Sequence, residues 1–239
     1  MPKPEYAVIL SAGLGTRLKD KTVSCPKVML PFAGKPLLGH HLEWLRRYGV
    51  SRVFLNLHYM PESIREYCGD GSRFGVGITY SYEPQLRGTA GALNGFRDQL
   101  DRTFLVHYGD VYSELDLDKL YDFHQGKGAA ATLVVHPTNR PHDSDVVVMD
   151  ETAQVRSVHH KPGTNEFGNM GNAASKMLEP EMLAYVPEGE QPSDFIQHVI
   201  PAAIAAGRPV YAYDTAEFLM DMGTPDRHQK LESYLAGRR

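Results

Sequence analysis

Short apolar runs alternate with amphipathic segments along the first half of the chain. The apolar runs are rich in β-branched and aromatic side chains and predict strands at residues 6–10, 52–57, 77–82 and 103–108. The segments between them predict helices at residues 36–48, 61–68 and 90–100. Pro36 suits the first turn of the first helix, and Gly49 suits its end. This alternation is typical of a mainly parallel sheet wrapped by helices.

The second half carries more strand-like segments, joined by polar connections. Strands are predicted at residues 129–136, 145–149, 155–159 and 209–213, and helices at residues 194–206 and 225–235. The pattern at residues 173–178 favours no element. Since there is no internal repeat, linker or low-complexity tract, we expect one domain over residues 1–239 with an elaborated C-terminal half.

Composition and charge exclude some classes of function. The 239 residues are 42% hydrophobic and 23% charged, which is ordinary for a globular protein. A net charge of -4 argues against a general nucleic-acid binder. No apolar run approaches the roughly 18 residues of a membrane span. The two cysteines, Cys25 and Cys68, make no disulfide framework, so we expect a reducing, cytoplasmic setting.

A glycine-rich loop, residues 11–17, follows the first predicted strand. Such a loop lets backbone N–H groups approach an anion, although a βα turn that binds nothing is an alternative. A dinucleotide fingerprint would need glycine where Leu18 stands, and a Walker loop would need Gly-Lys-Ser/Thr. The remaining pattern, Gly-x-Gly-Thr-Arg, places Arg17 to reach phosphates, which favours a nucleotide ligand.

Residues 10–18, followed by Pro26-Lys27, resemble the signature of the sugar-1-phosphate nucleotidyltransferases, also called nucleoside-diphosphate-sugar pyrophosphorylases. Similar motifs follow in the family's order at residues 82–93, 109–110, 159–162 and 221–225. The resemblance covers nearly the whole chain, although Asp20 and Lys21 stand where the family commonly has proline and leucine. It implies a Rossmann-like three-layer α/β/α fold with a mixed, mainly parallel central sheet. It also implies transfer of a nucleoside monophosphate from a triphosphate to a sugar 1-phosphate, releasing pyrophosphate.

The resemblance implies roles for single residues. The catalytic residues would be Arg17 on the leaving pyrophosphate, Lys27 on the transferred phosphate and Lys161 on the attacking phosphate. The nucleotide would contact Leu10, Ala12, Gly13, Gly15, Thr16, Glu83, Gly88 and Thr89, with Gly88-Thr89 also forming a close-approach turn and a helix N-cap. The sugar phosphate would contact Tyr108, Asp145, Asn169 and Lys161. Residues 1–112 would form the nucleotide-binding half and residues 113–239 the sugar-phosphate-binding half.

Asp110 and Asp221 are the carboxylates that the resemblance assigns to Mg²⁺. Asp110 follows an apolar strand, and ligands of open α/β sheets bind at the carboxyl ends of strands. Mg²⁺ prefers one or two carboxylates completed by phosphates and water. No histidine or cysteine spacing specifies a zinc site.

Substrate identity is predicted from departures within these motifs. Glu83 could accept hydrogen bonds from two N–H donors of guanine, which favours GTP. His160 replaces the glutamate of a Glu-Lys-Pro motif, and Asp145 lies in the segment that occupies the place of a sugar-side glycine. These departures indicate a sugar other than glucose. Residues 141–145 resemble pyrophosphorylases of heptose pathways, so a heptose 1-phosphate is our sharper hypothesis.

Other functions stay open. Uridylyl or cytidylyl transfer to a hexose or amino-sugar 1-phosphate is the nearest alternative, and a non-catalytic nucleotide-binding module is another. A nicotinamide oxidoreductase would need an acidic residue after the second strand, where Asn56-Leu57-His58 stands. We expect no nucleic-acid or membrane partner, and a homodimer is an open prediction. Trp44, flanked by helical leucines, is expected in the core.

Overall fold

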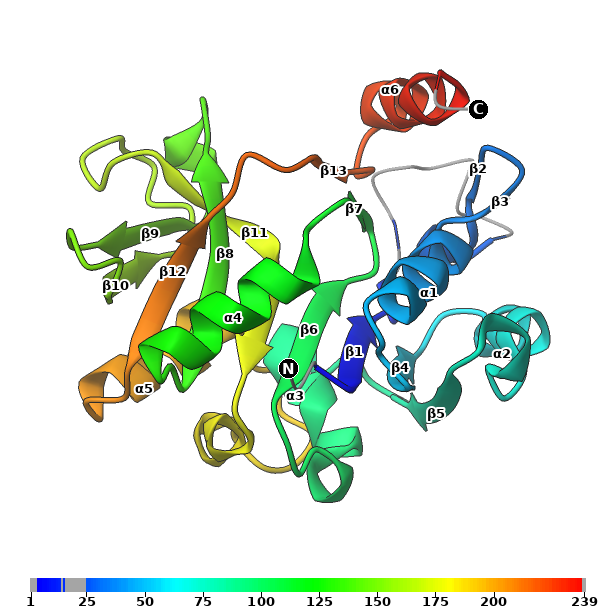
Figure 1. Ribbon diagram of the computed structural model, residues 1–239, viewed down its shortest axis with the longest axis horizontal. Helices are drawn as coiled ribbons and strands as arrows, with labels where there is room; N and C mark the ends of the chain where they lie inside the picture. The colour runs from blue at the N-terminus through cyan, green and yellow to red at the C-terminus, as the bar shows by residue number, and fades with distance from the viewer. Residues whose placement is uncertain (1–3, 14, 16–24, 238–239) are drawn as a thin grey trace. The chain divides into compact units, whose positions relative to one another are not determined.

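The computed structural model describes residues 4–13, 15 and 25–237, whose contacts divide the chain into two compact units (Figure 1). Unit 1 comprises Met1–Leu86, His107–Leu115 and Glu217–Arg239, and unit 2 comprises Arg87–Val106 and Asp116–Ala216. Strand β6 (Phe104–Tyr108) contributes to both units, because the boundary falls after Val106. A single domain divided near residue 112 remains a prediction.

The sheet strands of unit 1 follow the order β6-β1-β4-β5. Strand β1 pairs in parallel with β4, and β4 pairs in parallel with β5. These strands span Tyr6–Leu10 (β1), Arg52–Leu57 (β4) and Gly77–Tyr82 (β5). The helices are α1 (Leu37–Arg47), α2 (Pro61–Cys68) and α6 (Pro225–Ala236). Two short antiparallel pairs join β2 (Pro31–Phe32) to β3 (Lys35–Pro36) and β7 (Val111–Ser113) to β13 (Leu219–Asp221).

Helix α1 shows why this sequence forms this layer. Its apolar side chains recur at helical spacing and are buried, each leucine contributing roughly 1.5–3 kcal/mol. Arg46 and Arg47 lie in the last turn, where positive charge complements the helix dipole. Gly49, with a φ of 86°, then takes the left-handed conformation that ends the helix. Trp44 is buried and donates a hydrogen bond to the Leu115 carbonyl at 3.0 Å, which confirms its place in the core.

Unit 2 has a mixed sheet, in which β10, β9, β11 and β6 follow one another and β8 joins β11 to β12. Strand β8 pairs in parallel with β12, whereas the β8–β11 and β9–β10 pairs are antiparallel. The strands are β8 (Ala131–Pro137), β9 (Val146–Met149), β10 (Val155–His159), β11 (Met170–Leu178) and β12 (Val210–Asp214). The helices are α3 (Gly88–Gly91), α4 (Leu117–Lys127) and α5 (Ile200–Ala205), the last preceded by a π-helical turn at Phe195–Val199.

The predicted helix at residues 90–100 is wrong in extent. Helix α3 ends at Gly91 and is followed by 3₁₀ turns at Ala92–Gly95 and Arg97–Gln99. Glycines weaken a continuous helix here, and the Asn94 amide donates to the Pro187 carbonyl at 2.8 Å. Residues 173–178, which the sequence left unassigned, belong to β11.

Helix α4 was missed by the sequence analysis. Its start is marked by Asp116, whose carboxylate accepts hydrogen bonds from the N–H groups of Asp118 and Lys119, and its end by Gly128 in the left-handed conformation. Its buried stripe contains His124 among leucines, and this polar residue interrupts the apolar pattern.

The expected fold class is confirmed as a mixed, mainly parallel sheet with covering helices (Figure 1). Across the described ranges of the chain, no helix is long and apolar enough to cross a membrane.

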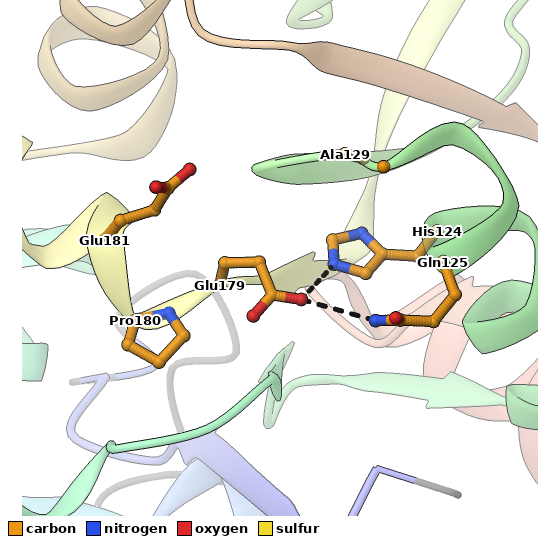
Figure 2. Close-up of a pocket in the computed structure, with 7 residues that line it drawn as sticks. His124, Gln125, Ala129, Glu179, Pro180 and Glu181 are labelled. Atoms are coloured by element: carbon orange, nitrogen blue, oxygen red, sulfur yellow. Dashed lines mark hydrogen bonds and ion pairs between the residues drawn. The ribbon is translucent and has the colours of Figure 1, made fainter.

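A buried hydrogen-bond network centres on His124 in unit 2 (Figure 2). Its Nδ1 lies 2.8 Å from Thr132 Oγ1, and its Nε2 lies 3.1 Å from Glu179 Oε1. The Thr103 hydroxyl and the Gln125 amide also donate to Glu179 Oε1, at 2.7 and 3.3 Å. Burial lowers the pKa of His124, although the Glu179 carboxylate opposes this effect. The network lines one side of a cavity of about 370 Å³.

We predict that His124→Gln makes the free energy of unfolding fall less between pH 7 and pH 5.5. The unfolded chain binds a proton at the ordinary histidine pKa of 6.5, whereas folded His124 binds one only at lower pH. Its contribution to the free energy of unfolding is therefore present above pH 6.5 and is lost as the pH falls below that value. Urea unfolding at pH 7 and at pH 5.5 should show a smaller loss in the variant than in the wild type. The exposed His142→Gln serves as control, and an equal loss in all three proteins would contradict the prediction.

Candidate active site

The carboxyl ends of the parallel strands in unit 1 are tied by a buried polar network. Ser11 N–H donates to Asn56 Oδ1 at 2.8 Å, and the Ser11 hydroxyl donates to the Asn56 carbonyl. The Asn56 amide in turn donates to Glu83 Oε1 at 2.8 Å. Because β1, β4 and β5 run in parallel, these residues meet at one edge of the sheet and fix the start of the glycine-rich loop.

The described part of this loop supports close approach of a ligand. Leu10 is half-buried and Ala12 is buried, whereas Gly13 is exposed. A Cβ atom at Gly13 would meet no neighbouring atom within 4 Å in the described structure, so packing does not require glycine there. Gly15 has a φ of 65°, a conformation that favours glycine. Thr16 and Arg17, predicted to bind the triphosphate, lie outside the described residues.

Asp110 and Asp221, the two predicted metal carboxylates, belong to neighbouring backbone segments of unit 1, although they are far apart in sequence. Asp110 follows β6, and Asp221 ends β13. Strand β13 pairs with β7 so that Asp221 lies opposite Val111, and Met222 N–H donates to the Asp110 carbonyl at 3.0 Å. The short β7–β13 ladder therefore places Asp221 directly beside Asp110.

Gly109 keeps Asp110 close to the loop that follows β1. Its N–H donates to the Leu10 carbonyl at 3.0 Å. A Cβ atom at this position would lie 2.7 Å from the Leu10 oxygen and 2.8 Å from Val28 Cγ1, so any side chain would force the backbones apart. The Gly-Asp pair thus has a packing reason for its glycine and leaves its carboxylate at the strand end.

Two cations neutralise these carboxylates. Lys27, which is buried, forms an ion pair with Asp110, and Arg227 forms one with Asp221. Burial alone would raise the pKa of Asp221, but the Arg227 hydrogen bond, the Gly223 N–H and the charges of Arg227 and Lys27 lower it overall. Lys27 therefore acts on both carboxylates. Arg227 was not among the predicted site residues; its signal was a cation in the first turn of the helix that follows the Asp221 motif.

The donor set fits Mg²⁺. Two adjacent carboxylates leave positions for phosphate oxygens and water, as this ion usually requires. In the described parts of the chain, no three histidine, cysteine, aspartate or glutamate residues gather to hold a metal by themselves.

Gly88 and Thr89, predicted to contact the nucleotide, lie in unit 2 against Ser193 and Asp194. Gly88 has a φ of 76°, and a Cβ atom there would lie 2.5 Å from the Ser193 carbonyl oxygen. The Thr89 hydroxyl donates to Asp194 Oδ1 at 2.8 Å and accepts from Phe195 N–H at 3.2 Å. The prediction that Thr89 caps the helix is wrong, because Arg87 occupies the N-cap position and no side chain caps this helix.

Asp145 and His160, two departures from the family pattern, are brought together in unit 2. His160 Nδ1 lies 2.7 Å from Asp145 Oδ1, and the Asp145 carbonyl accepts a hydrogen bond from Asn172 N–H at 2.7 Å. Lys161 is exposed in a left-handed conformation, with its Nζ 4.0 Å from Asp143 Oδ1. A long, exposed ion pair of this kind leaves the ammonium available to a phosphate.

Asn169 and Tyr108 are the other two residues predicted to contact the sugar phosphate. Asn169 is exposed, and its carbonyl accepts a hydrogen bond from Thr138 N–H at 2.8 Å. Tyr108 is half-buried at the end of β6, in unit 1. Among the described hydrogen bonds of unit 2, none joins Asn169 to the Asp145–His160 pair.

Asn172 is a candidate ligand residue that the sequence analysis missed. Its Oδ1 is buried and finds no hydrogen-bond donor in the described structure. A buried acceptor without a donor is costly, and a hydroxyl group of a ligand would satisfy it. The feature of the sequence that could have indicated it is a second asparagine two residues after Met170, in the segment that forms β11.

Comparison with known proteins places the chain in a family. Residues 6–236 match the family model described as nucleotidyl transferase. The chain is 33% identical over 246 residues to a UTP–glucose-1-phosphate uridylyltransferase of Synechocystis, covering 96% of the chain and 63% of that protein. It is 36% identical over 225 residues to a mannose-1-phosphate guanylyltransferase of Mycobacterium tuberculosis, covering 92% of the chain and 61% of that protein.

The fold has a close counterpart among solved structures. The crystal structure of HddC from Yersinia pseudotuberculosis superposes with a TM-score of 0.80 at 24% identity, over 97% of this chain and 99% of that one. The chain spans less than two thirds of the length of the two curated relatives, and the names of these relatives differ in the nucleotide and in the sugar. The match over residues 6–236 shows that the chain belongs to the nucleotidyl transferase family.

Proposed function

We propose that the protein is an enzyme that transfers a nucleoside monophosphate from a nucleoside triphosphate to a sugar 1-phosphate. The observation that carries this proposal is the junction of Asp110 and Asp221 beside Lys27, at the strand end where the glycine-rich loop begins. Family membership and the names of both curated relatives support the same reaction class.

The chemistry requires positioning more than proton transfer. An oxygen of the sugar 1-phosphate attacks the α-phosphorus, forming a new P–O bond, and the bond between that phosphorus and the bridging oxygen breaks. The electron pair of the broken bond leaves with pyrophosphate. One P–O bond forms and one breaks, and the total charge is unchanged. A phosphate monoester is already an anionic nucleophile, so no general base is needed.

Each predicted residue then has a task. Asp110 and Asp221 would hold Mg²⁺, which when bound neutralises phosphate charge. Lys27 turns from Asp110 to the transferred phosphate as phosphate oxygens fill the site. Arg17 and Thr16 bind the triphosphate at the loop, and Lys161 holds the attacking phosphate in the second half of the chain.

GTP is the favoured nucleotide. Glu83 is only 1% exposed and is held by the Asn56 amide, so its carboxylate is fixed at the strand end rather than solvated. A fixed carboxylate can accept hydrogen bonds from the paired N–H donors of guanine and so distinguish guanine from other bases. Uridylyl or cytidylyl transfer is the alternative, and the name of the Synechocystis relative supports its uridylyl form.

The sugar is proposed to be a heptose 1-phosphate. The support is the Asp145–His160 pair, which offers a carboxylate and an imidazole where the family commonly has glycine and glutamate.

We further propose a reducing, cytoplasmic setting, in keeping with free Cys25 and Cys68. A homodimer and a non-catalytic binding role stay predictions to be tested.

The reaction and both substrates can be tested together. Pyrophosphate release is measured with Mg²⁺ for ATP, GTP, CTP, UTP and dTTP, each against glucose, mannose, glucosamine and heptose 1-phosphates. We expect GTP with a heptose 1-phosphate to exceed the other pairs. If a different pair gives the fastest release, that pair replaces the proposed substrates. If the protein binds GTP but releases no pyrophosphate with any of the sugar phosphates, the proposal that it is this enzyme is overturned.

We predict that Asp110→Asn lowers turnover by at least about a hundredfold, because the isosteric amide loses the charge that Mg²⁺ and Lys27 share. Thermal unfolding should stay close to that of the wild type. The exposed Asp98→Asn is the matched control and should keep its turnover. Folded Asp110→Asn protein with wild-type activity would remove Asp110 from the metal site.

We predict that Glu83→Gln lowers the GTP-over-UTP ratio of kcat/KM by roughly tenfold, since one paired base contact is worth about 1–3 kcal/mol. The glutamine carbonyl can still accept the Asn56 hydrogen bond, so the link between the ends of β4 and β5 should be kept. The exposed Glu66→Gln is the control. An unchanged ratio would exclude Glu83 from base recognition.

A further inference from the structure

A cavity of about 570 Å³ in unit 1 lies between the end of α1 and the 3₁₀ turn at Ser72–Phe74, which follows α2. The residues that line it are Glu43, Arg46, Arg47, Arg73 and Phe74. Cavities of this size are typical of small-molecule sites. None of these residues has a task in the proposed transfer reaction, so the cavity calls for an explanation of its own.

The three arginines of this cavity have no carboxylate partner in the described part of the chain. All three are exposed, and no described aspartate or glutamate lies within ion-pair distance of their guanidinium groups. Glu43, the carboxylate in the lining, forms an ion pair with Lys35 instead. The cavity therefore carries an excess of positive charge, which a bound anion would offset.

The end of α1 accounts for only part of this charge. Arg46 and Arg47 lie in the last turn of the helix, where they complement its dipole. Arg73 belongs to a separate segment of the chain, and the dipole of α1 gives no reason for it to line the same cavity. The gathering of three guanidinium groups therefore needs a second cause.

Arg73 is held in place by aromatic rings. Its guanidinium carbon lies 4.3 Å from the centroid of the Tyr67 ring and 4.6 Å from that of Phe74. Tyr67 packs in turn on α1, because a Cβ atom at Gly39 would lie 2.4 Å from its hydroxyl oxygen. Stacking covers the face of a guanidinium, whereas the N–H donors that bind phosphate lie along its edge.

Arg46 is accommodated by Gly75, which ends the same 3₁₀ turn. A Cβ atom at Gly75 would lie 2.7 Å from Arg46 Nε, so any side chain there would displace the guanidinium. Gly75 has a φ of 72°, a conformation that also favours glycine. One turn thus places two guanidinium groups from different elements, and such preorganisation lowers the entropic cost of binding an anion.

We propose that this cavity is a second anion site, which binds the phosphate group of a small molecule through Arg46, Arg47 and Arg73. Arginine presents paired N–H donors that match phosphate oxygens, and Phe74 offers an apolar surface to the organic part of the ligand. The net charge of -4 favours a small phosphate compound over a nucleic acid. The site stands independently of the proposed transfer reaction.

We predict that Arg46→Gln and Arg73→Gln each weaken the binding of inorganic phosphate at least about tenfold, because each loses a charge-assisted contact. Nuclear magnetic resonance of the arginine Nε–Hε groups measures Kd in the full chain and locates the site. The buffer has low ionic strength, since salt screens exposed charges. Arg46→Lys keeps the charge without the paired donors and should give an intermediate Kd.

The matched control is Arg156→Gln. Arg156 is also exposed, but it forms an ion pair with Asp150, so its loss should leave phosphate binding at the wild-type Kd. Phosphate can also bind at the candidate active site, and Lys27→Met separates that contribution. The signals of Arg46, Arg47 and Arg73 should shift with phosphate in Lys27→Met as they do in the wild type.

AMP and ribose 5-phosphate identify the source of the phosphate group. Tighter binding of AMP than of the other probes assigns the site to a nucleotide, and tighter binding of ribose 5-phosphate assigns it to a sugar phosphate. Equal affinity for these two compounds and inorganic phosphate assigns it to free phosphate. Each of these results supports the proposed site.

The opposite results are equally clear. Phosphate binding that is lost in Lys27→Met and unchanged in Arg46→Gln and Arg73→Gln overturns the proposal, as does an absence of phosphate-dependent shifts at all three arginines in the wild type. Failure of the transfer reaction would leave this proposal standing, because the measurement needs no turnover. Wild-type unfolding temperatures in the arginine variants show that they are folded.

Discussion

The short pairing of β7 with β13 is the constraint on which the candidate active site depends. It joins Asp221, near the C-terminal end of the chain, to Asp110 at the end of a central strand. Lys27 pairs with Asp110 and Arg227 pairs with Asp221, so each carboxylate has a cation beside it within unit 1. Lysine and arginine are also suited to phosphate, which agrees with the proposed transfer from a nucleoside triphosphate.

The rest of unit 1 supports this junction. Gly109 allows β6 and its turn to pack against Leu10, and the Ser11–Asn56–Glu83 network ties the ends of three parallel strands. Under the proposed function, a ligand at this edge would meet backbone N–H groups and buried polar side chains that are already in place, and Lys27 is the cation that would turn toward it. Such preorganisation is what phosphoryl-type chemistry requires from a protein.

The parts of the site that follow short sequence motifs could be predicted, and the parts set by side-chain burial could not. Asp110, Asp221 and Lys27 follow recognisable strand-end or loop patterns, and the structure brings them together. Asn169 follows from a motif resemblance and stays a prediction, whereas the buried Oδ1 of Asn172 depends on β11, and the pattern at residues 173–178 favoured no element. Helix α4 was not predicted because His124 interrupts its apolar stripe.

The most direct test of the account is whether Asp110 and Asp221 hold one metal ion with the nucleotide. Mn²⁺ can replace Mg²⁺ and be counted by electron paramagnetic resonance, with a non-hydrolysable GTP analogue present. We expect one bound Mn²⁺ per wild-type chain, and binding at least about tenfold weaker in folded Asp221→Asn. Equal Mn²⁺ affinity in the wild type and in Asp221→Asn would contradict the claim that these carboxylates form the metal site.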